Sequence, residues 1–240
     1  MKNHSLFTFI LGFFILIGCA GDPATQAETE VSHDENFVYK VDQFADLKIL
    51  RYQVPGFEQL PLKQKQLLYY LYKASLAGRD IIYDQNFKYN LAIRRTLEAI
   101  VNSGKKDESG DYENFMVYAK RVWFSNGIHH HYSQDKIQPE FSQEYFAELV
   151  NSADPNQLPL KEGQSVDDFL AEISPIIFDP SIAAKKVNLA SDIDHVTKSA
   201  VNFYEGVTEA EVDAYYEGII DKTDEEPISY GLNTKVVKEN

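Results

Sequence analysis

The chain has a single cysteine, Cys19, and this restricts how the rest of the sequence can fold. With one thiol no disulfide can form within the chain, so the folded part must be held together by a buried apolar core. No aromatic residue occurs in residues 19–36, and the aromatic residues that could build such a core are frequent from Phe37 onward. A domain of the size of residues 37–240 can bury enough surface to be stable without covalent cross-links.

Residues 1–18 have the pattern of a bacterial lipoprotein signal peptide. Lys2 gives a positive start, Leu6 to Ile17 is a nearly unbroken apolar run, and small residues flank Cys19. This arrangement is typical of a secretory signal, and the run is short for a membrane-spanning helix. The pattern predicts cleavage before Cys19 and lipidation of its thiol, which would anchor the protein to a membrane of the cell envelope without inserting the domain. An ordinary signal peptide with a chance cysteine is the alternative.

The net charge limits the partners that the chain can bind. The formal charge is −14, and removal of residues 1–18 takes away one positive charge, that of Lys2, so −14 becomes −15. This acidic balance disfavours nucleic acids and anionic lipid surfaces as partners. Residues 19–36 are polar and acidic and contain no aromatic residue, which predicts a flexible tether between the lipid and the folded residues 37–240.

Helical spacing and capping residues predict most of the folded part. Apolar residues recur at helical spacing over residues 62–78 and 86–102, and three further helices are expected after the capping residues Ser142, Ser165 and Thr208. The side chains expected to face the core are Leu67, Leu71 and Ala74 in the first helix, Ile93, Leu97, Ile100 and Val101 in the second, and Tyr145, Phe146, Leu149, Val150, Phe169, Leu170, Ile173, Val212, Tyr215, Tyr216, Ile219 and Ile220 in the others.

The side-chain pattern of two segments predicts β-strands. Residues 47–54 alternate roughly between apolar and polar side chains and end at Pro55-Gly56, and residues 231–237 alternate in the same way. A helix-rich chain with a few strands that need pairing partners indicates the α+β class.

Three consecutive histidines, His129 to His131, form the most conspicuous polar cluster. On a strand the first and third would share a face and could bind a metal ion. Three adjacent histidines cannot all converge on one tetrahedral ion, however, and catalytic zinc sites use helical spacing such as His-Glu-x-x-His. Two other interpretations are a structural loop packed against the aromatic core and a substrate groove whose polar groups bind a peptide backbone. The substrate-cleft candidates are Asn126, His129, His130, His131 and Tyr132.

Other catalytic patterns are missing from the sequence. His195 has Asp192 and Asp194 beside it, but nothing supplies further metal ligands, so a solvated loop or helix start is expected there. The sequence contains no phosphate-binding glycine loop, no Gly-x-Ser-x-Gly and no His-Glu-x-x-His. From its residues alone, the chain is an exported domain for which we assign no catalytic residue and no metal site.

Three strings of residues resemble a known family. They are Trp-Phe-Ser-Asn-Gly-Ile-His-His-His-Tyr at 123–132, Asn-Phe-Tyr-Glu-Gly-Val-Thr at 202–208 and Tyr-Gly-Leu-Asn-Thr-Lys-Val-Val-Lys at 230–238. In this order and spacing they resemble the N-terminal portion of the dipeptidyl peptidase III family, in its Bacteroidetes-type lipoprotein form. The resemblance extends from about Phe37 to Asn240, and the first string is the most specific part of it.

The resemblance implies a two-lobed zinc exopeptidase that removes dipeptides from the N terminus of short peptides. In the family a His-Glu-x-x-Gly-His helix and a later Glu-Glu-x-x-Arg-Ala helix supply the zinc ligands and the general base, and neither motif occurs in this sequence. Residues 37–240 would correspond to the non-catalytic lobe, a small and here incomplete β-barrel wrapped by helices. The resemblance transfers no catalytic residue to this chain.

We therefore expect the front part of a lipid-anchored zinc dipeptidyl peptidase. Alone it would be inactive, and with the missing catalytic lobe it would form one wall of the peptide cleft. The alternative is a non-enzymatic surface lipoprotein that binds peptides or acts as a scaffold. A large bare apolar surface would favour the first hypothesis, because soluble monomers rarely expose one, and a self-contained polar surface would favour the second.

Overall fold

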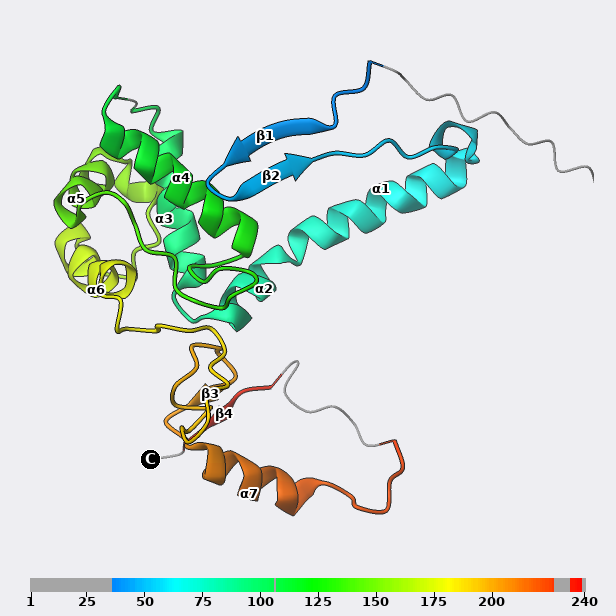
Figure 1. Cartoon of the computed structure of the whole chain (residues 1–240), viewed down its shortest axis with the longest axis vertical. Coiled ribbons are helices and arrows are strands. Elements are labelled where there is room, and N and C mark those ends of the chain that lie inside the picture. Colours follow the sequence, from blue (N-terminus) through cyan, green and yellow to red (C-terminus); the bar gives the residue numbers. More distant parts are fainter. Residues whose placement is uncertain (1–35, 106, 227–233, 239–240) are drawn as a thin grey trace, which may run out of the picture.

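Helices make up most of the regular structure (Figure 1). The computed structural model describes residues 36–105, 107–226 and 234–238, and this part of the chain is mostly helical with two small two-stranded sheets. The elements are β1 (Lys40–Phe44), β2 (Leu47–Leu50), the 3-10 helix η1 (Phe57–Gln59), α1 (Leu62–Ala77), α2 (Arg79–Asn86), α3 (Asn90–Asn102), α4 (Gly110–Ser125), α5 (Gln143–Ser152), the 3-10 helix η2 (Pro155–Gln157), α6 (Val166–Phe178), β3 (Tyr204–Glu205), α7 (Glu209–Ile219) and β4 (Val236–Val237). The predicted signal peptide, Cys19 and all of the tether except Asn36 lie outside the described residues.

Helices α3 to α6 enclose the hydrophobic core, and we call them the helical body. The predicted caps of α5 and α6 are confirmed, because the hydroxyls of Ser142 and Ser165 each accept a hydrogen bond from the backbone N–H three residues later. The core is built from Ile93, Leu97 and Ile100 of α3, Phe115 and Val122 of α4, Phe146 and Leu149 of α5, and Phe169, Ile173 and Ile177 of α6. Among the described helices, none is long and apolar enough to cross a bilayer.

The predicted helix over residues 86–102 is α3, which begins four residues later than expected, at Asn90. The backbone of Phe87 is extended, at φ −170° and ψ 136°, so α2 ends at Asn86 and α3 begins at Asn90. The break allows the Phe87 side chain to join the buried core, a long-range contact that local spacing does not reveal. Helix α4, which the spacing argument did not predict, supplies the Phe115 side of that core.

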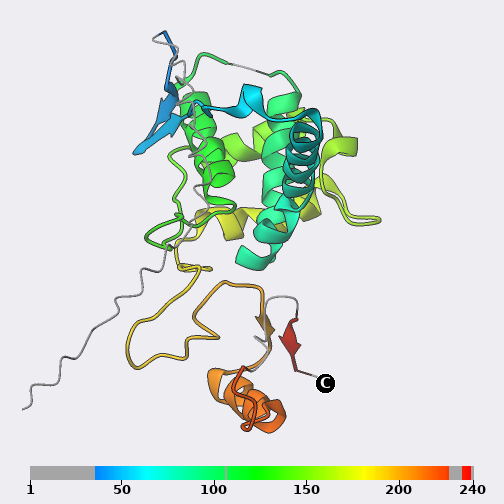
Figure 2. The same cartoon turned by 90° about the vertical axis from the view of Figure 1, so that its right-hand side faces the viewer.

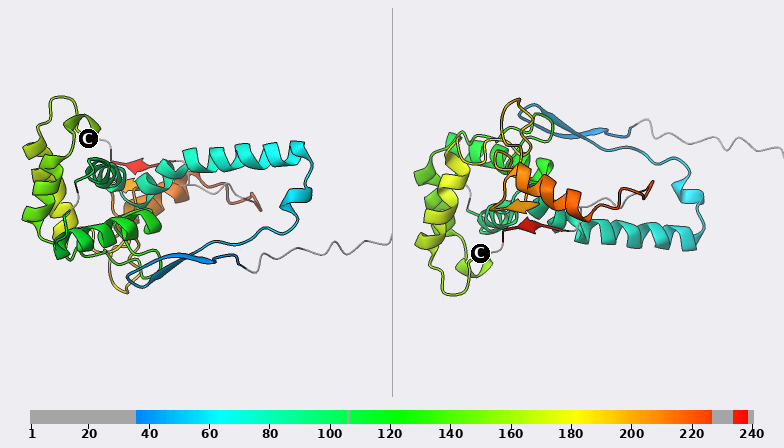
Figure 3. Two further views of the ribbon diagram at one scale, coloured as in Figure 1. Left: turned by 90° about the horizontal axis from the view of Figure 1, so that it is seen from above. Right: turned by 90° about the horizontal axis from the view of Figure 1, so that it is seen from below.

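The N-terminal hairpin and α1 project from the helical body (Figure 3). Strands β1 and β2 pair antiparallel, and the pairing ends at Lys40 and Leu50. Because β1 begins at Lys40, the expected strand over 47–54 stops at Leu50. Helix α1 forms where the sequence predicts it, but none of its residues, all of which the structure describes, is buried. The prediction that Leu67, Leu71 and Ala74 of this helix face a core is therefore wrong within the described chain.

The C-terminal elements β3, β4 and α7 lie together at one end of the molecule (Figures 1 and 2). Strand β3 pairs parallel with β4, which confirms part of the predicted strand over 231–237, whereas residues 231–233 lie outside the described part. No closed barrel is present among the described residues. The capping box of α7 is confirmed, since the Thr208 hydroxyl accepts from the Glu211 N–H and the Glu211 carboxylate accepts from the Thr208 N–H. Val212 of α7 is buried and Tyr216 is half-buried, but Tyr215, Ile219 and Ile220 are exposed, contrary to the sequence-based expectation.

Candidate functional site

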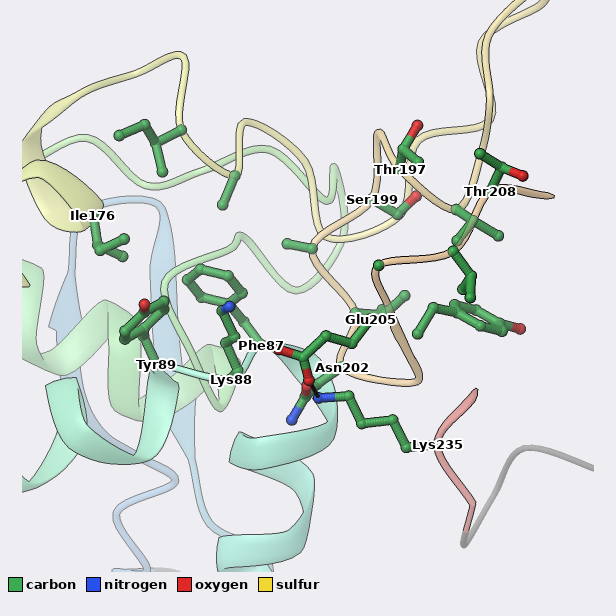
Figure 4. A pocket seen from close by; sticks show the side chains of 18 residues that line it. Phe87, Lys88, Tyr89, Ile176, Thr197, Ser199, Asn202, Glu205, Thr208 and Lys235 are labelled. Atoms are coloured by element: carbon green, nitrogen blue, oxygen red, sulfur yellow. Dashed lines mark hydrogen bonds and ion pairs between the residues drawn. The ribbon is translucent and has the colours of Figure 1, made fainter. Parts of the chain in front are cut away.

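A groove of about 610 Å³ separates the helical body from the C-terminal segment (Figure 4). One wall comes from the α2–α3 connection, Phe87 to Tyr89, and from Ile176, Ile182 and Ala183. The other comes from residues between Val196 and Thr208 together with Lys235. The volume falls within the range of sites that hold small ligands, which is about 300–1,000 Å³.

Three charged side chains line the groove. Lys235 Nζ lies 2.5 Å from Glu205 Oε2, and the hydrogen bond from Lys235 holds the pKa of Glu205 below its usual range, with further contributions from the charges of Lys235 and Lys88. Lys88 also lies over the Tyr89 ring, 5.4 Å from its centroid. Two ammonium groups against one carboxylate leave a positive excess, which suits a carbonyl or carboxylate oxygen of a bound molecule.

Backbone hydrogen bonds hold the C-terminal wall in place. The Asn202 N–H donates to the Gln85 carbonyl at 2.9 Å, which fixes this wall to the end of α2. The N–H groups of Val236 and Lys238 donate to the carbonyls of Phe203 and Glu205. The strings at 202–208 and 230–238 are therefore neighbours in space, and both contribute residues to the groove.

His129 lies behind the groove wall rather than in the groove. Its side chain is buried, its Nε2 lies 2.7 Å from the Ala183 carbonyl, and its ring packs edge-on against Phe87 at 5.8 Å between centroids. Phe87 and Ala183 both line the groove. Burial lowers the pKa of His129 to about 4, so the imidazole is neutral near pH 7. This geometry makes His129 a support for the wall.

The two other histidines of the cluster face a different part of the molecule. His130 Nδ1 accepts hydrogen bonds from the N–H groups of Tyr132 and Ser133, and its Nε2 lies 3.4 Å from Asp46 Oδ2 in the turn between β1 and β2. The His131 ring packs edge-on against Phe124, and burial together with the neighbouring His130 lowers its pKa. The three imidazoles therefore do not converge on one point.

The remaining candidates flank the histidines. Asn126 ends α4 in the left-handed conformation, at φ 53°, and its carbonyl accepts a hydrogen bond from the Asn86 side chain. Tyr132 is 85% exposed. None of the five substrate-cleft candidates is among the groove-lining residues within the described chain.

His195 lies in a turn and contacts Glu209, the first residue of α7. Its Nδ1 lies 2.9 Å from Glu209 Oε1, and the hydrogen bond to Glu209 raises the pKa of His195. The neighbouring Asp194 carboxylate accepts a hydrogen bond from the Glu209 N–H. Of the two outcomes expected at this position, a solvated loop or a helix start, the structure shows the loop.

The described residues do not form a metal site. No group of three or more His, Cys, Asp or Glu side chains in this part of the chain is close enough together to hold a metal ion. The donor set that zinc prefers, three or four converging nitrogen, sulfur or carboxylate ligands, is therefore not assembled by these residues.

Neither the models of known protein families nor the curated proteins contain a match to this chain. The groove residues Lys88, Thr197, Glu205 and Lys235 were not singled out individually from the sequence. The one signal that pointed toward them was that two of the strings with family resemblance, 202–208 and 230–238, contain Glu205 and Lys235.

Proposed function

We propose that this chain is the non-catalytic N-terminal lobe of a lipid-anchored zinc dipeptidyl peptidase that removes dipeptides from short peptides. The observation that carries the proposal is the convergence of the strings with family resemblance on one groove. Strings 202–208 and 230–238 contribute to one wall, and His129 from string 123–132 supports the other. The groove would form one side of the peptide cleft, and β3 and β4 would belong to a small β-barrel that other strands complete.

Exposed apolar side chains support this proposal over a self-contained binding module. Large apolar residues of α1 and of the segment between β2 and η1 are exposed, among them Tyr70 at 68%, Tyr52 at 73% and Val54 at 70%. In α7, Tyr215 and Ile219 are exposed as well. Soluble monomers rarely leave apolar patches of this extent bare, so these surfaces favour a lobe that packs against further polypeptide.

Zinc would be bound outside this chain, because its described residues do not fit the metal and its sequence lacks the zinc motif. In the intact enzyme the ion would activate a water molecule and polarise the scissile carbonyl. The chain's own residues would then bind and orient the peptide.

The purified chain from residue 20 to residue 240 is expected to contain no stoichiometric zinc and to leave a dipeptidyl-naphthylamide uncleaved. A longer protein, encoded by an open or frameshifted frame with His-Glu-x-x-Gly-His after codon 240, is expected to contain stoichiometric zinc and to cleave this substrate. Metal analysis and release of naphthylamine measure the two properties. Activity with bound zinc in the short chain would refute the proposal, and a genuine stop followed by unrelated sequence would favour the non-enzymatic peptide-binding or scaffold lipoprotein.

In the active longer protein, Lys88→Met should weaken substrate binding through loss of an ammonium group from the groove. We expect KM to rise about tenfold with little change in kcat, since a hydrogen bond to a charged group contributes roughly 1.5–3 kcal/mol. Lys222→Met, which removes an exposed lysine beyond α7, is the matched control. Equal KM values for the two variants would mean that the groove is not part of the peptide-binding cleft.

A further inference from the structure

A second, smaller cavity lies on the helical body, between the start of α3 and α6. Its volume is about 280 Å³, and the apolar part of its lining comes from Tyr89, Ala92, Pro159, Phe169 and Ile173. Phe169 and Ile173 are 3% and 1% exposed and belong to the hydrophobic core. Close packing of the core therefore fixes the apolar floor of the cavity.

A hydrogen-bonded network forms one rim of this cavity. Lys161 Nζ donates to both carboxylate oxygens of Glu172, at 2.7 and 2.9 Å, and the Gln164 side chain donates to Glu172 Oε2 at 2.9 Å. The Gln164 amide is itself held in place, since its Oε1 accepts a hydrogen bond from the Lys161 N–H at 3.1 Å. Hydrogen bonds from Lys161 and Gln164 hold the pKa of Glu172 below its usual range, so this side chain is ionised near pH 7. Because its two oxygens already accept three hydrogen bonds, Glu172 has little capacity left for an ammonium group of a ligand.

The charges around the cavity favour an anion instead. Lys88 and Lys161 line it, and Glu172 is the only carboxylate among the described residues that do, so one positive charge is in excess. Lys88 Nζ lies over the Tyr89 ring, 5.4 Å from its centroid, and forms no ion pair with another described residue. Its donors are therefore open to a ligand. One carboxylate matches the excess charge, whereas a doubly charged phosphate group would exceed it.

We infer that this cavity binds a small organic acid with one carboxylate and an apolar body about the size of one aromatic ring. The carboxylate accepts hydrogen bonds from Lys88 and Lys161, and the apolar body packs on Phe169 and Ile173. The volume is slightly below the range of about 300–1,000 Å³ that is usual for ligand sites, which limits the ligand to this size. The inference does not rest on the proposed function, because the cavity shares only Lys88 and Tyr89 with the groove.

An NMR titration of the purified chain, residues 20–240, with 3-phenylpropionate tests the inference. We expect a Kd of a few millimolar, which is ordinary for a ligand with about eleven non-hydrogen atoms, and shifts of the backbone N–H signals of Ala92, Gln164 and Ile173. The uncharged 3-phenylpropionamide, which has the same shape, should bind at least about tenfold more weakly. Shifts confined to groove residues such as Thr197, no shifts at about 20 mM probe, or equal affinity for the amide would each overturn the inference.

Two substitutions at the rim should change the affinity in opposite directions. Lys161→Met removes a donor and the excess positive charge, so the Kd for 3-phenylpropionate should rise about tenfold. Glu172→Gln removes the only carboxylate of the lining and frees the Lys161 ammonium, so the Kd should fall about threefold or more. Glu148→Gln, at an exposed position of α5 outside the cavity, changes the charge of the chain equally and should leave the Kd unchanged. If Glu172→Gln weakens binding or has no effect, the rim network only supports its loop and the inference is wrong.

Discussion

Replacing Gly127 by alanine is expected to lower the free energy of unfolding by about 3–5 kcal/mol. Gly127 has φ 144°, a conformation that L residues rarely adopt, and a Cβ atom there would lie 2.1 Å from Asn90 Nδ2. Asn90 is buried and cannot move freely, since its Oδ1 accepts a hydrogen bond from the Ile128 N–H at 3.0 Å. Backbone strain at residue 127, overlap of the new Cβ with the Asn90 amide and loss of this hydrogen bond would therefore all destabilise the folded chain.

Urea unfolding of residues 20–240 measures the effect, with two glycine variants as controls. Gly104→Ala has a positive φ of 74° but no described atom within 4 Å of the new Cβ, so it isolates the backbone strain at about 1 kcal/mol. Gly110→Ala, at the start of α4, has neither problem and should be neutral or slightly stabilising. If Gly127→Ala loses no more stability than Gly104→Ala, the close packing of Asn90 against Gly127 is not what fixes this turn.

The sequence predicts features that depend on neighbouring residues along the chain. The caps at Ser142, Ser165 and Thr208 form as expected because a capping hydrogen bond joins residues three positions apart. The buried face of α3 also forms as expected, since Ile93 and Leu97 lie one turn apart on the same side of the helix.

Whether an apolar stripe is buried is harder to predict. The spacing of apolar residues shows that a helix has such a stripe, but it does not show what covers the stripe. Leu67 and Leu71 of α1 and Ile219 of α7 follow helical spacing and are exposed in the described chain. Spacing therefore predicts both helices correctly and says nothing about what covers them. Spacing also does not predict the extended backbone at Phe87, whose side chain packs against His129, more than forty positions away.

The groove combines residues that only the folded chain brings together. Lys88 and Lys235 lie almost 150 positions apart, and no local pattern connects them. For the histidine cluster, local spacing argued that three adjacent histidines cannot all converge on one tetrahedral ion. In the structure the His129 side chain is buried and His130 lies beside Asp46.

Acid should destabilise the chain through His129 in particular. Burial lowers the pKa of His129 to about 4 in the folded state, against an ordinary value of 6.5. Between these two pH values the unfolded chain binds a proton that the folded chain does not, so the free energy of unfolding falls as the pH falls. At 1.36 kcal/mol for each pKa unit, the loss from pH 7 to pH 4 is about 3 kcal/mol, with little further loss from this group below pH 4.

His129→Gln isolates this effect from the protonation of the many carboxylates. The glutamine amide can still donate a hydrogen bond to the Ala183 carbonyl, but it does not titrate. Urea unfolding at several pH values should therefore show the wild-type chain losing stability relative to His129→Gln as the pH falls from 7 to 4.

His195→Gln is the matched control. As the pH falls from 7 to 4, the wild-type chain should gain stability relative to His195→Gln, opposite to its loss relative to His129→Gln. Glu209 raises the pKa of His195, so the stability from this pair is present below pH 6.5 and is lost as the pH rises through the folded-state pKa. Parallel stability curves for the wild type and His129→Gln would mean that the His129 imidazole is protonated as readily in the folded state as in the unfolded chain. In that case His129 could not be the neutral support that holds Ala183 and Phe87 in the groove wall.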